Sequence, residues 1–206
     1  MGNDESRDLF FLSPQRLEAI TDGIFAVGMT LLVLGIDVPA LPRGVSGAEL
    51  AEALWKLGLP LFKYLVSFLL LGSFWVTNIG QIRYVRRVDA TFLWLGMGSL
   101  LLVALLPFST SLVGDFPDRT PAELFFHANI FGICAFHALQ WVHATKGHRL
   151  VDPGLAWEIV DGAKRQNLLA PAFAVIGMAI SPLEIFESNF IYIAIPFLAA
   201  LRRRMP

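Results

Sequence analysis

Residues 13–37 read SPQRLEAITDGIFAVGMTLLVLGID, and no charged residue lies between Gly23 and Ile36. A helix over residues 14–37 would be about 34 Å long, enough to cross a hydrocarbon core of roughly 30 Å. Asp22 lies one turn inside the apolar run, where a carboxylate is costly unless a partner neutralises it. The stretch therefore predicts a membrane-spanning helix that carries a candidate functional acid.

The side chains of this helix separate by face at 100° per residue. Thr21, Gly28 and Gly35 are spaced by seven and predict a groove that another helix can approach closely. We call these three residues the small-residue groove. A second line, which we call the apolar seam, contains a single hydroxyl and consists of Ile20, Gly23, Ile24, Val27, Thr30, Leu31 and Leu34. The seam could face lipid or neighbouring helices, as most apolar stripes do, or line a pore if several copies surround an axis.

The composition of the whole chain is typical of an integral membrane protein. Of its 206 residues, 55% are hydrophobic and only 16% are charged, whereas about 25% are charged in soluble domains. The net charge of −1 offers no electrostatic basis for binding nucleic acid. The sequence contains no nucleophile elbow, glycine-rich phosphate loop or HExxH motif. We therefore expect neither an enzyme nor a bound cofactor.

Apolar stretches and the breaks between them predict one all-α membrane domain over residues 1–206. We expect six spanning helices and an amphipathic helix before the second of them. The spans lie approximately at residues 14–37, 61–85, 90–114, 122–145, 166–180 and 186–201, and the amphipathic helix at 48–58.

The distribution of Lys and Arg predicts the orientation of these spans. With the N-terminus in the cytoplasm, 12 of the 16 basic residues fall on that side, as the positive-inside rule requires. They are Arg7, Arg16, Arg83, Arg86, Arg87, Lys146, Arg149, Lys164, Arg165, Arg202, Arg203 and Arg204. We therefore expect a multi-pass protein of the cell membrane with both termini in the cytoplasm.

The buried acid needs a partner from another helix. Arg16 and Asp22 are six residues apart and diverge by about 120° on one helix, so they cannot pair directly. Candidate partners for Thr21 and Asp22 follow Trp75 in the second span, and they are Thr77, Asn78 and Gln81. Such a network could be purely structural, or Asp22 could take a direct part in transport.

Four histidines lie on or just after the fourth span, and they are His127, His137, His143 and His148. No pair has the i,i+3 or i,i+4 spacing that a metal site on one helix prefers. We therefore expect them in packing or interfacial roles and expect no tightly bound metal.

The segment Arg16-Leu-Glu-Ala-Ile-Thr-Asp22, followed by an apolar run that contains Thr30, resembles a known signature. It is similar to the RxxxFSD first-helix motif of the bacterial transmembrane protein 175 family of potassium channels. The likeness continues at Phe74-Trp75, at Val88-Asp89 and through residues 102–108. The resemblance implies a homotetramer with a pore lined by the first helix of each subunit, and without the TVGYG-type filter of ordinary potassium channels.

The resemblance also implies roles for individual residues. Val27 corresponds to the narrowest hydrophobic layer, and Leu31 and Leu34 to further apolar layers. Thr30 corresponds to a threonine layer implicated in selectivity, near which K⁺ would bind transiently. The polar network that holds the first helix corresponds to Arg16, Thr21, Asp22, Trp75 and Asn78.

The sequence departs from the family pattern at four positions. Ile20 replaces the motif phenylalanine, and Thr21 replaces its serine, so the hydroxyl survives without the aromatic contact. Asn78 stands in the segment that usually bears a histidine, and must take over its hydrogen bonding. Val27 is smaller than the usual isoleucine or leucine, which could widen the constriction.

The resulting hypothesis is a passive channel in the lipid bilayer for potassium and other monovalent cations. One alternative is a proton-coupled secondary transporter that uses Asp22 as a relay, although we find no inverted repeats to favour it. Another is a membrane scaffold or enzyme subunit that conducts nothing.

Overall fold

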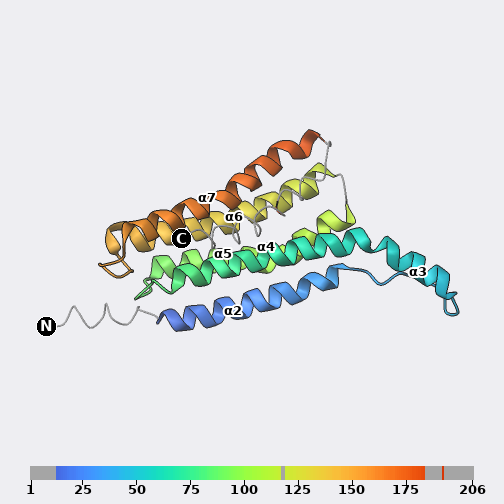
Figure 1. Ribbon diagram of the computed structural model, residues 1–206, viewed down its shortest axis with the longest axis horizontal. Coiled ribbons are helices and arrows are strands. Elements are labelled where there is room, and N and C mark those ends of the chain that lie inside the picture. The colour runs from blue at the N-terminus through green and yellow to red at the C-terminus, as the bar shows by residue number, and fades with distance from the viewer. Residues whose placement is uncertain (1–12, 117–118, 184–191, 193–206) are drawn as a thin grey trace.

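The computed structural model describes residues 13–116, 119–183 and Tyr192, and the regular structure of this part is entirely helical (Figure 1). The 3-10 helices are marked η. In chain order the elements are α2 (Pro14–Leu31), η1 (Leu32–Gly35), α3 (Gly47–Lys56), α4 (Gly58–Ile82), α5 (Ala90–Asp115), α6 (Thr120–Thr145), η2 (Lys146–His148), α7 (Trp157–Ile180) and η3 (Ser181–Leu183). The all-α fold predicted from the sequence is confirmed for the described residues.

Five of the described helices are long and apolar enough to cross a membrane. Counted with the 3-10 turns that continue them, they are Pro14–Gly35, Gly58–Ile82, Ala90–Asp115, Thr120–His148 and Trp157–Leu183. The sixth predicted span, residues 186–201, lies outside the described residues apart from Tyr192.

Helix α7 begins well before the span predicted at residues 166–180, because a helix can extend beyond the apolar core of a membrane. Its first turns contain charged residues, which excluded them from an apolar window. Charged side chains are nevertheless compatible with a helix, and can pair along it. The Nζ atom of Lys164 lies 3.6 Å from Oδ1 of Asp161, one turn away.

Helix α3 is the amphipathic element predicted at residues 48–58, and Leu57 separates it from α4. A reciprocal capping box fixes its start, because the backbone N–H of Glu49 donates to Oγ of Ser46 at 3.2 Å and the backbone N–H of Ser46 donates to Oε2 of Glu49 at 2.9 Å. Figure 1 shows α3 projecting past the end of α2 and away from the other helices.

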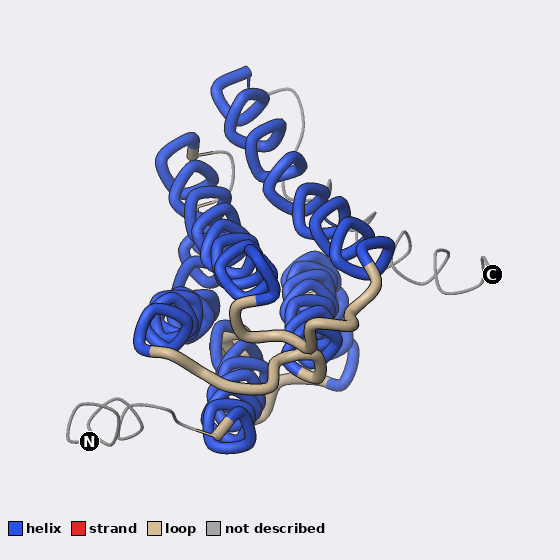
Figure 2. Tube along the Cα trace, turned by 90° about the vertical axis from the view of Figure 1, so that its left-hand side faces the viewer, coloured by secondary structure: helices blue, strands red, loops and turns tan. Residues whose placement is uncertain are grey.

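The spanning helices pack around α5, which contacts α2, α4 and α6, while α6 contacts α7. Figure 2 views them along their length and shows them lying alongside one another. The interior is apolar, and its completely buried residues include Phe25, Leu70, Leu71, Val103, Leu106, Ile130 and Ile133. Helix α2 therefore lies at one side of the bundle, in contact with α4 and α5.

The small-residue groove of α2 is where α4 and α5 approach it, as the sequence predicted. A Cβ atom on Gly28 would lie 3.3 Å from Cδ2 of Leu71 and 3.7 Å from the backbone oxygen of Val103. A Cβ atom on Gly35 would overlap Oγ of Ser111. The absence of side chains at these two positions sets how closely α2 approaches the bundle.

A substitution at Gly28 tests this contact. We expect Gly28→Val to lower the free energy of unfolding by about 1–3 kcal/mol relative to Gly23→Val, because its branched carbons would overlap α4 and α5. Gly23 is the matched control, since a Cβ there meets nothing within 4 Å and the cost of valine in a helix is the same. Thermal unfolding in detergent measures the difference, and equal melting temperatures would contradict the close contact.

Candidate functional site

The two faces of α2 have opposite environments. Leu17, Thr21, Phe25 and Gly28 are buried against the bundle, and Leu32 continues this face into η1. The apolar seam lies on the other side, where Val27 is 56% exposed, Leu31 41% and Leu34 73%. In the described part of the chain, the predicted gate residues are therefore not covered by other helices, and they face outward along one line.

Thr30 lies on the exposed side of α2 together with Val27. Its hydroxyl Oγ1 donates a hydrogen bond to the backbone oxygen of Val27 at 2.8 Å. Because the hydroxyl proton is committed to the helix, the lone pairs of the oxygen remain available to a group outside it. The seam therefore offers one oxygen ligand within an otherwise apolar surface.

Asp22 is joined to α4 by a hydrogen bond that crosses between the helices. The indole N–H of Trp75 donates to Oδ1 of Asp22 at 2.8 Å. This hydrogen bond offsets part of the cost of placing a carboxyl group in an apolar span. The structure brings together these two predicted site residues.

Two of the predicted partners of Asp22 are engaged elsewhere. Oγ1 of Thr77 donates to the backbone oxygen of Ser73, and Nε2 of Gln81 donates to Oδ1 of Asn167 on α7 at 2.7 Å. Arg16 is exposed and forms no ion pair with another described residue. Trp75, rather than Thr77 or Gln81, is therefore the residue of the second span that reaches the acid.

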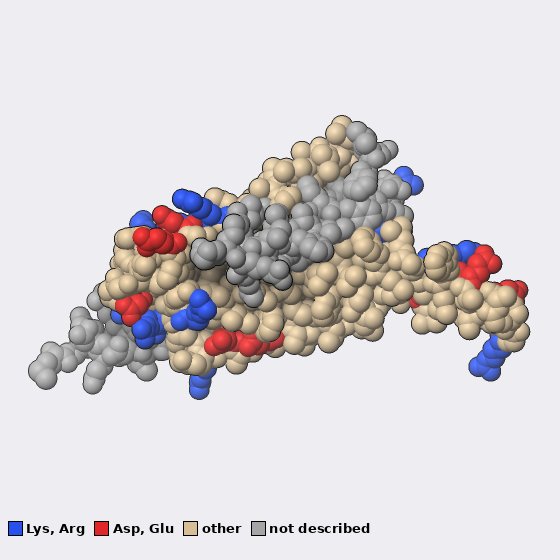
Figure 3. Space-filling model, in the orientation of Figure 1, with Lys and Arg blue, Asp and Glu red and all other residues tan. Residues whose placement is uncertain are grey.

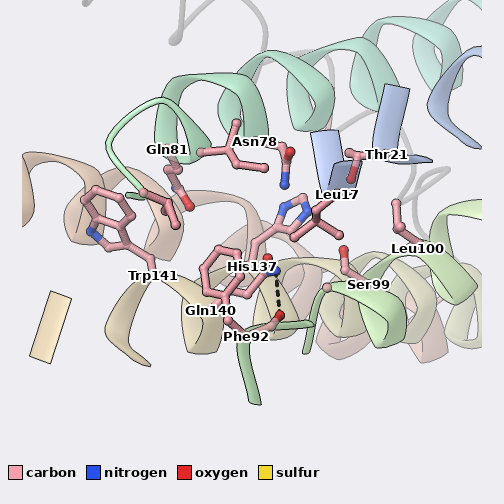
Figure 4. A pocket seen from close by; sticks show the side chains of 13 residues that line it. Leu17, Thr21, Asn78, Gln81, Phe92, Ser99, Leu100, His137, Gln140 and Trp141 are labelled. Atoms are coloured by element: carbon pink, nitrogen blue, oxygen red, sulfur yellow. Dashed lines mark hydrogen bonds between the residues drawn. The ribbon is translucent and has the colours of Figure 1, made fainter. Parts of the chain in front are cut away.

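Thr21 and Asn78 border a small polar cavity between α2, α4, α5 and α6 (Figure 4). Polar residues that the sequence analysis did not assign to a site also line it, namely Ser99 on α5 and Gln140 on α6. His137, read from the sequence as a packing residue, lies beside them. In the sequence, the one indication of these cavity-lining residues is the spacing of His137 and Gln140, which are three residues apart and so share one face of a helix.

Charged residues at the ends of α5 and α6 form a second polar cluster, which contains the Asp89 of the family-like sequence. Oδ1 of Asp89 caps α5 by accepting from the backbone N–H of Phe92 at 2.8 Å, and Oδ2 lies 2.8 Å from Nε2 of His143. The nearby Arg86 pairs with Asp152 at 2.7 Å. Figure 3 shows one side of the molecule, on which charged side chains lie mainly toward the two ends and are sparse between them.

Comparison with known proteins shows which family carries this arrangement. The family described as the endosomal/lysosomal potassium channel TMEM175 matches residues 16–107. A potassium channel of Streptomyces collinus is 36% identical over 145 residues, which cover 67% of this chain and 68% of that protein. The chain belongs to the TMEM175 family. The family resemblance seen in the first helix is thereby confirmed.

Two further comparisons extend over most of this TMEM175 chain. A potassium channel of Chamaesiphon minutus is 29% identical over 191 residues, covering 91% of this chain and 93% of that protein. The crystal structure of a lysosomal potassium-selective channel TMEM175 homolog from the same organism has a TM-score of 0.78 at 26% identity, covering 93% of this chain and 98% of that one. Together with the five apolar helices, family membership establishes a multi-pass membrane protein.

The TMEM175 match at residues 16–107 includes both partners of the bond between Asp22 and Trp75. We expect Trp75→Phe to lower the free energy of unfolding by about 1.5–3 kcal/mol, because it leaves the carboxylate without this donor. Trp94→Phe is the control, since Trp94 is exposed on α5, and its effect should stay within about 0.5 kcal/mol. Equal shifts in thermal unfolding would argue against a stabilising bond.

The Asp89 cluster leads to a pH-dependent prediction. Partial burial raises the pKa of Asp89, but the hydrogen bonds from Phe92 and His143 and the charges of His143 and Arg149 outweigh it, so the pKa lies below its usual value of 3.8. A lowered carboxyl pKa contributes stability that is present above the unfolded-state value and is lost as the pH falls through the folded-state value.

We therefore expect Asp89→Asn, which keeps an N-cap side chain, to be less stable than the unaltered chain at neutral pH. The gap in melting temperature should shrink as the pH falls below about 4. A gap that widens on acidification would contradict the ionic contribution of Asp89.

Proposed function

We propose that this TMEM175 chain forms a potassium-permeable cation channel that conducts passively across the membrane. The relatives from Streptomyces collinus and Chamaesiphon minutus are both named as potassium channels. The observation in this chain that carries the proposal is the outward-facing apolar seam, with Thr30 as its single hydroxyl.

The pore would form between four copies of the chain, each contributing the exposed face of α2. This helix is suited to that position because it lies at one side of the bundle and buries only its opposite face. Gathering four seams around an axis would cover Val27, Leu31 and Leu34, and would turn each into a ring. In this homotetramer the seam from Ile20 to Leu34 would line about 21 Å of the pathway.

The rings would act as a hydrophobic gate without a TVGYG-type filter. A narrow apolar constriction gates by excluding water, because a hydrated ion cannot enter a segment that water has left. Val27 would form the narrowest ring. Thr30 would follow as a ring of hydroxyl oxygens, which offer ligands to a partly dehydrated K⁺ or another monovalent cation. The ion gradient would supply the driving force.

Asp22 would hold α2 in its rotation rather than relay protons. Its hydrogen bond runs to Trp75 on α4, on the side of α2 away from Val27. Thr21 and Asn78 would extend this polar contact between the two helices, and Arg16 would lie at its cytoplasmic end. The network would keep the seam directed at the pore axis.

The membrane arrangement follows from charge. Arg83, Arg86, Arg87 and Arg149 lie in the loops at the end of the bundle opposite α3, and this end would face the cytoplasm by the positive-inside rule. The N-terminus would lie on the same side. A sixth span at residues 186–201 would return the C-terminus there and complete a single membrane domain.

Substitution of Val27 tests the gate. We expect Val27→Asn to raise basal K⁺ flux in liposomes, because a polar ring lowers the barrier to hydration, and each 1.4 kcal/mol removed gives about a tenfold higher rate. Val33→Asn is the matched control, since Val33 is also exposed but is not part of the apolar seam. Its flux should equal that of the unaltered chain.

The same liposomes separate the channel from a proton-coupled transporter. Channel flux of K⁺ should be fast, unsaturated and independent of a proton gradient. Saturable uptake that requires a proton gradient and is abolished by Asp22→Asn would overturn the proposal in favour of a transporter. Equal flux for Val27→Asn and Val33→Asn would remove Val27 from the gate.

A further inference from the structure

A small cavity lies behind α2, on the side of the helix away from the apolar seam. Its volume is about 20 Å³. Side chains from four helices border it, with Thr21 on α2, Asn78 on α4, Ser99 on α5 and His137 on α6. Figure 4 shows these four side chains around one space.

One buried polar atom at this cavity, Oγ of Ser99, lacks a hydrogen-bond partner in the described part of the chain, and the ring of His137 lies at the same cavity. Ser99 is 1% exposed, and its Oγ has no partner. His137 is 5% exposed, and its ring meets Phe74 edge-on with the ring centroids 6.5 Å apart. A buried polar group left unsatisfied costs about 1–3 kcal/mol.

Serines elsewhere in the bundle show how Ser99 differs. Oγ of Ser73 donates to the backbone oxygen of Leu70, and Oγ of Ser109 donates to that of Leu106 while accepting from Asn129. A serine in a helix normally satisfies itself in this way when nothing better is present. The hydroxyl of Ser99 makes no such bond and instead borders the cavity.

We propose that this cavity is an internal water site, which holds one or at most two ordered water molecules between α2 and the bundle. A water molecule needs about 10–15 Å³ of cavity volume and two to four polar partners. Water can accept from Ser99 and both accept from and donate to a neutral imidazole and an amide. No Asp, Glu, Lys or Arg lines the cavity, so the chemistry favours water over an ion.

The bound water would connect α2 with α6, two helices that have little direct contact with each other. Helix α2 packs on α4 and α5, whereas His137 belongs to α6. A water molecule hydrogen-bonded to Thr21 and His137 would bridge this gap. The site does not depend on conduction through the apolar seam, because it lies on the opposite face of α2.

X-ray radiolytic footprinting of the full chain in detergent tests the proposal. The pulse generates hydroxyl radicals from water, including bound water, and mass spectrometry then measures oxidation of each side chain. His127 is the internal control, because it is also buried on α6 but lies outside the cavity, with Nδ1 2.7 Å from the hydroxyl of Tyr192. We expect His137 to be oxidised severalfold faster than His127. Equal rates would overturn the water site.

A variant at the cavity provides a second measurement. Ser99→Val would remove one hydrogen-bonding partner of the water and add a second methyl group at the cavity, so we expect the water to be lost and the oxidation rate of His137 to fall to that of His127. Ser73→Val, outside the cavity, should leave both rates unchanged. A fast His137 rate that survives Ser99→Val would assign the oxidation to bulk solvent and overturn the proposal. If Ser99→Val does not fold, the ratio in the unaltered chain still decides.

Discussion

The rotation of α2 depends on the close contact between its small-residue groove and the helices α4 and α5. In a membrane, apolar side chains gain little by leaving lipid for protein, so hydrophobicity alone does not choose which face of a helix packs inward. Backbone approach does choose, because the missing side chains of Gly28 and Gly35 admit Leu71, Val103 and Ser111 at short range. The apolar seam on the opposite face is thereby directed away from the bundle.

Hydrogen bonds between helices add specificity to this packing. Trp75 reaches Asp22 on α2, Thr110 reaches Ser67 on α4, and Gln81 reaches Asn167 on α7. A polar group in an apolar span gains most from a protein partner, since lipid offers none. Each bond therefore selects one neighbour and one register for the helix that carries it.

The two faces of α2 have different proposed roles. The outer face carries Val27 and Thr30, whose proposed contribution is a ring around an ion pathway. The inner face carries Gly28 for close packing and Thr21 beside the proposed water site. Under these two proposals, α2 would pack tightly at Gly28 and contact water at Thr21, about two turns away.

The sequence by itself determined the helical class and the division of α2 into a groove and a seam, because periodicity follows directly from helix geometry. The family signature around Asp22 was also readable. The sequence did not reveal that Trp75 bonds Asp22 while Gln81 turns to α7, nor that Ser99, His137 and Gln140 meet at one cavity. Those arrangements bring together residues from different helices, and only the packing of whole helices decides which polar groups face one another.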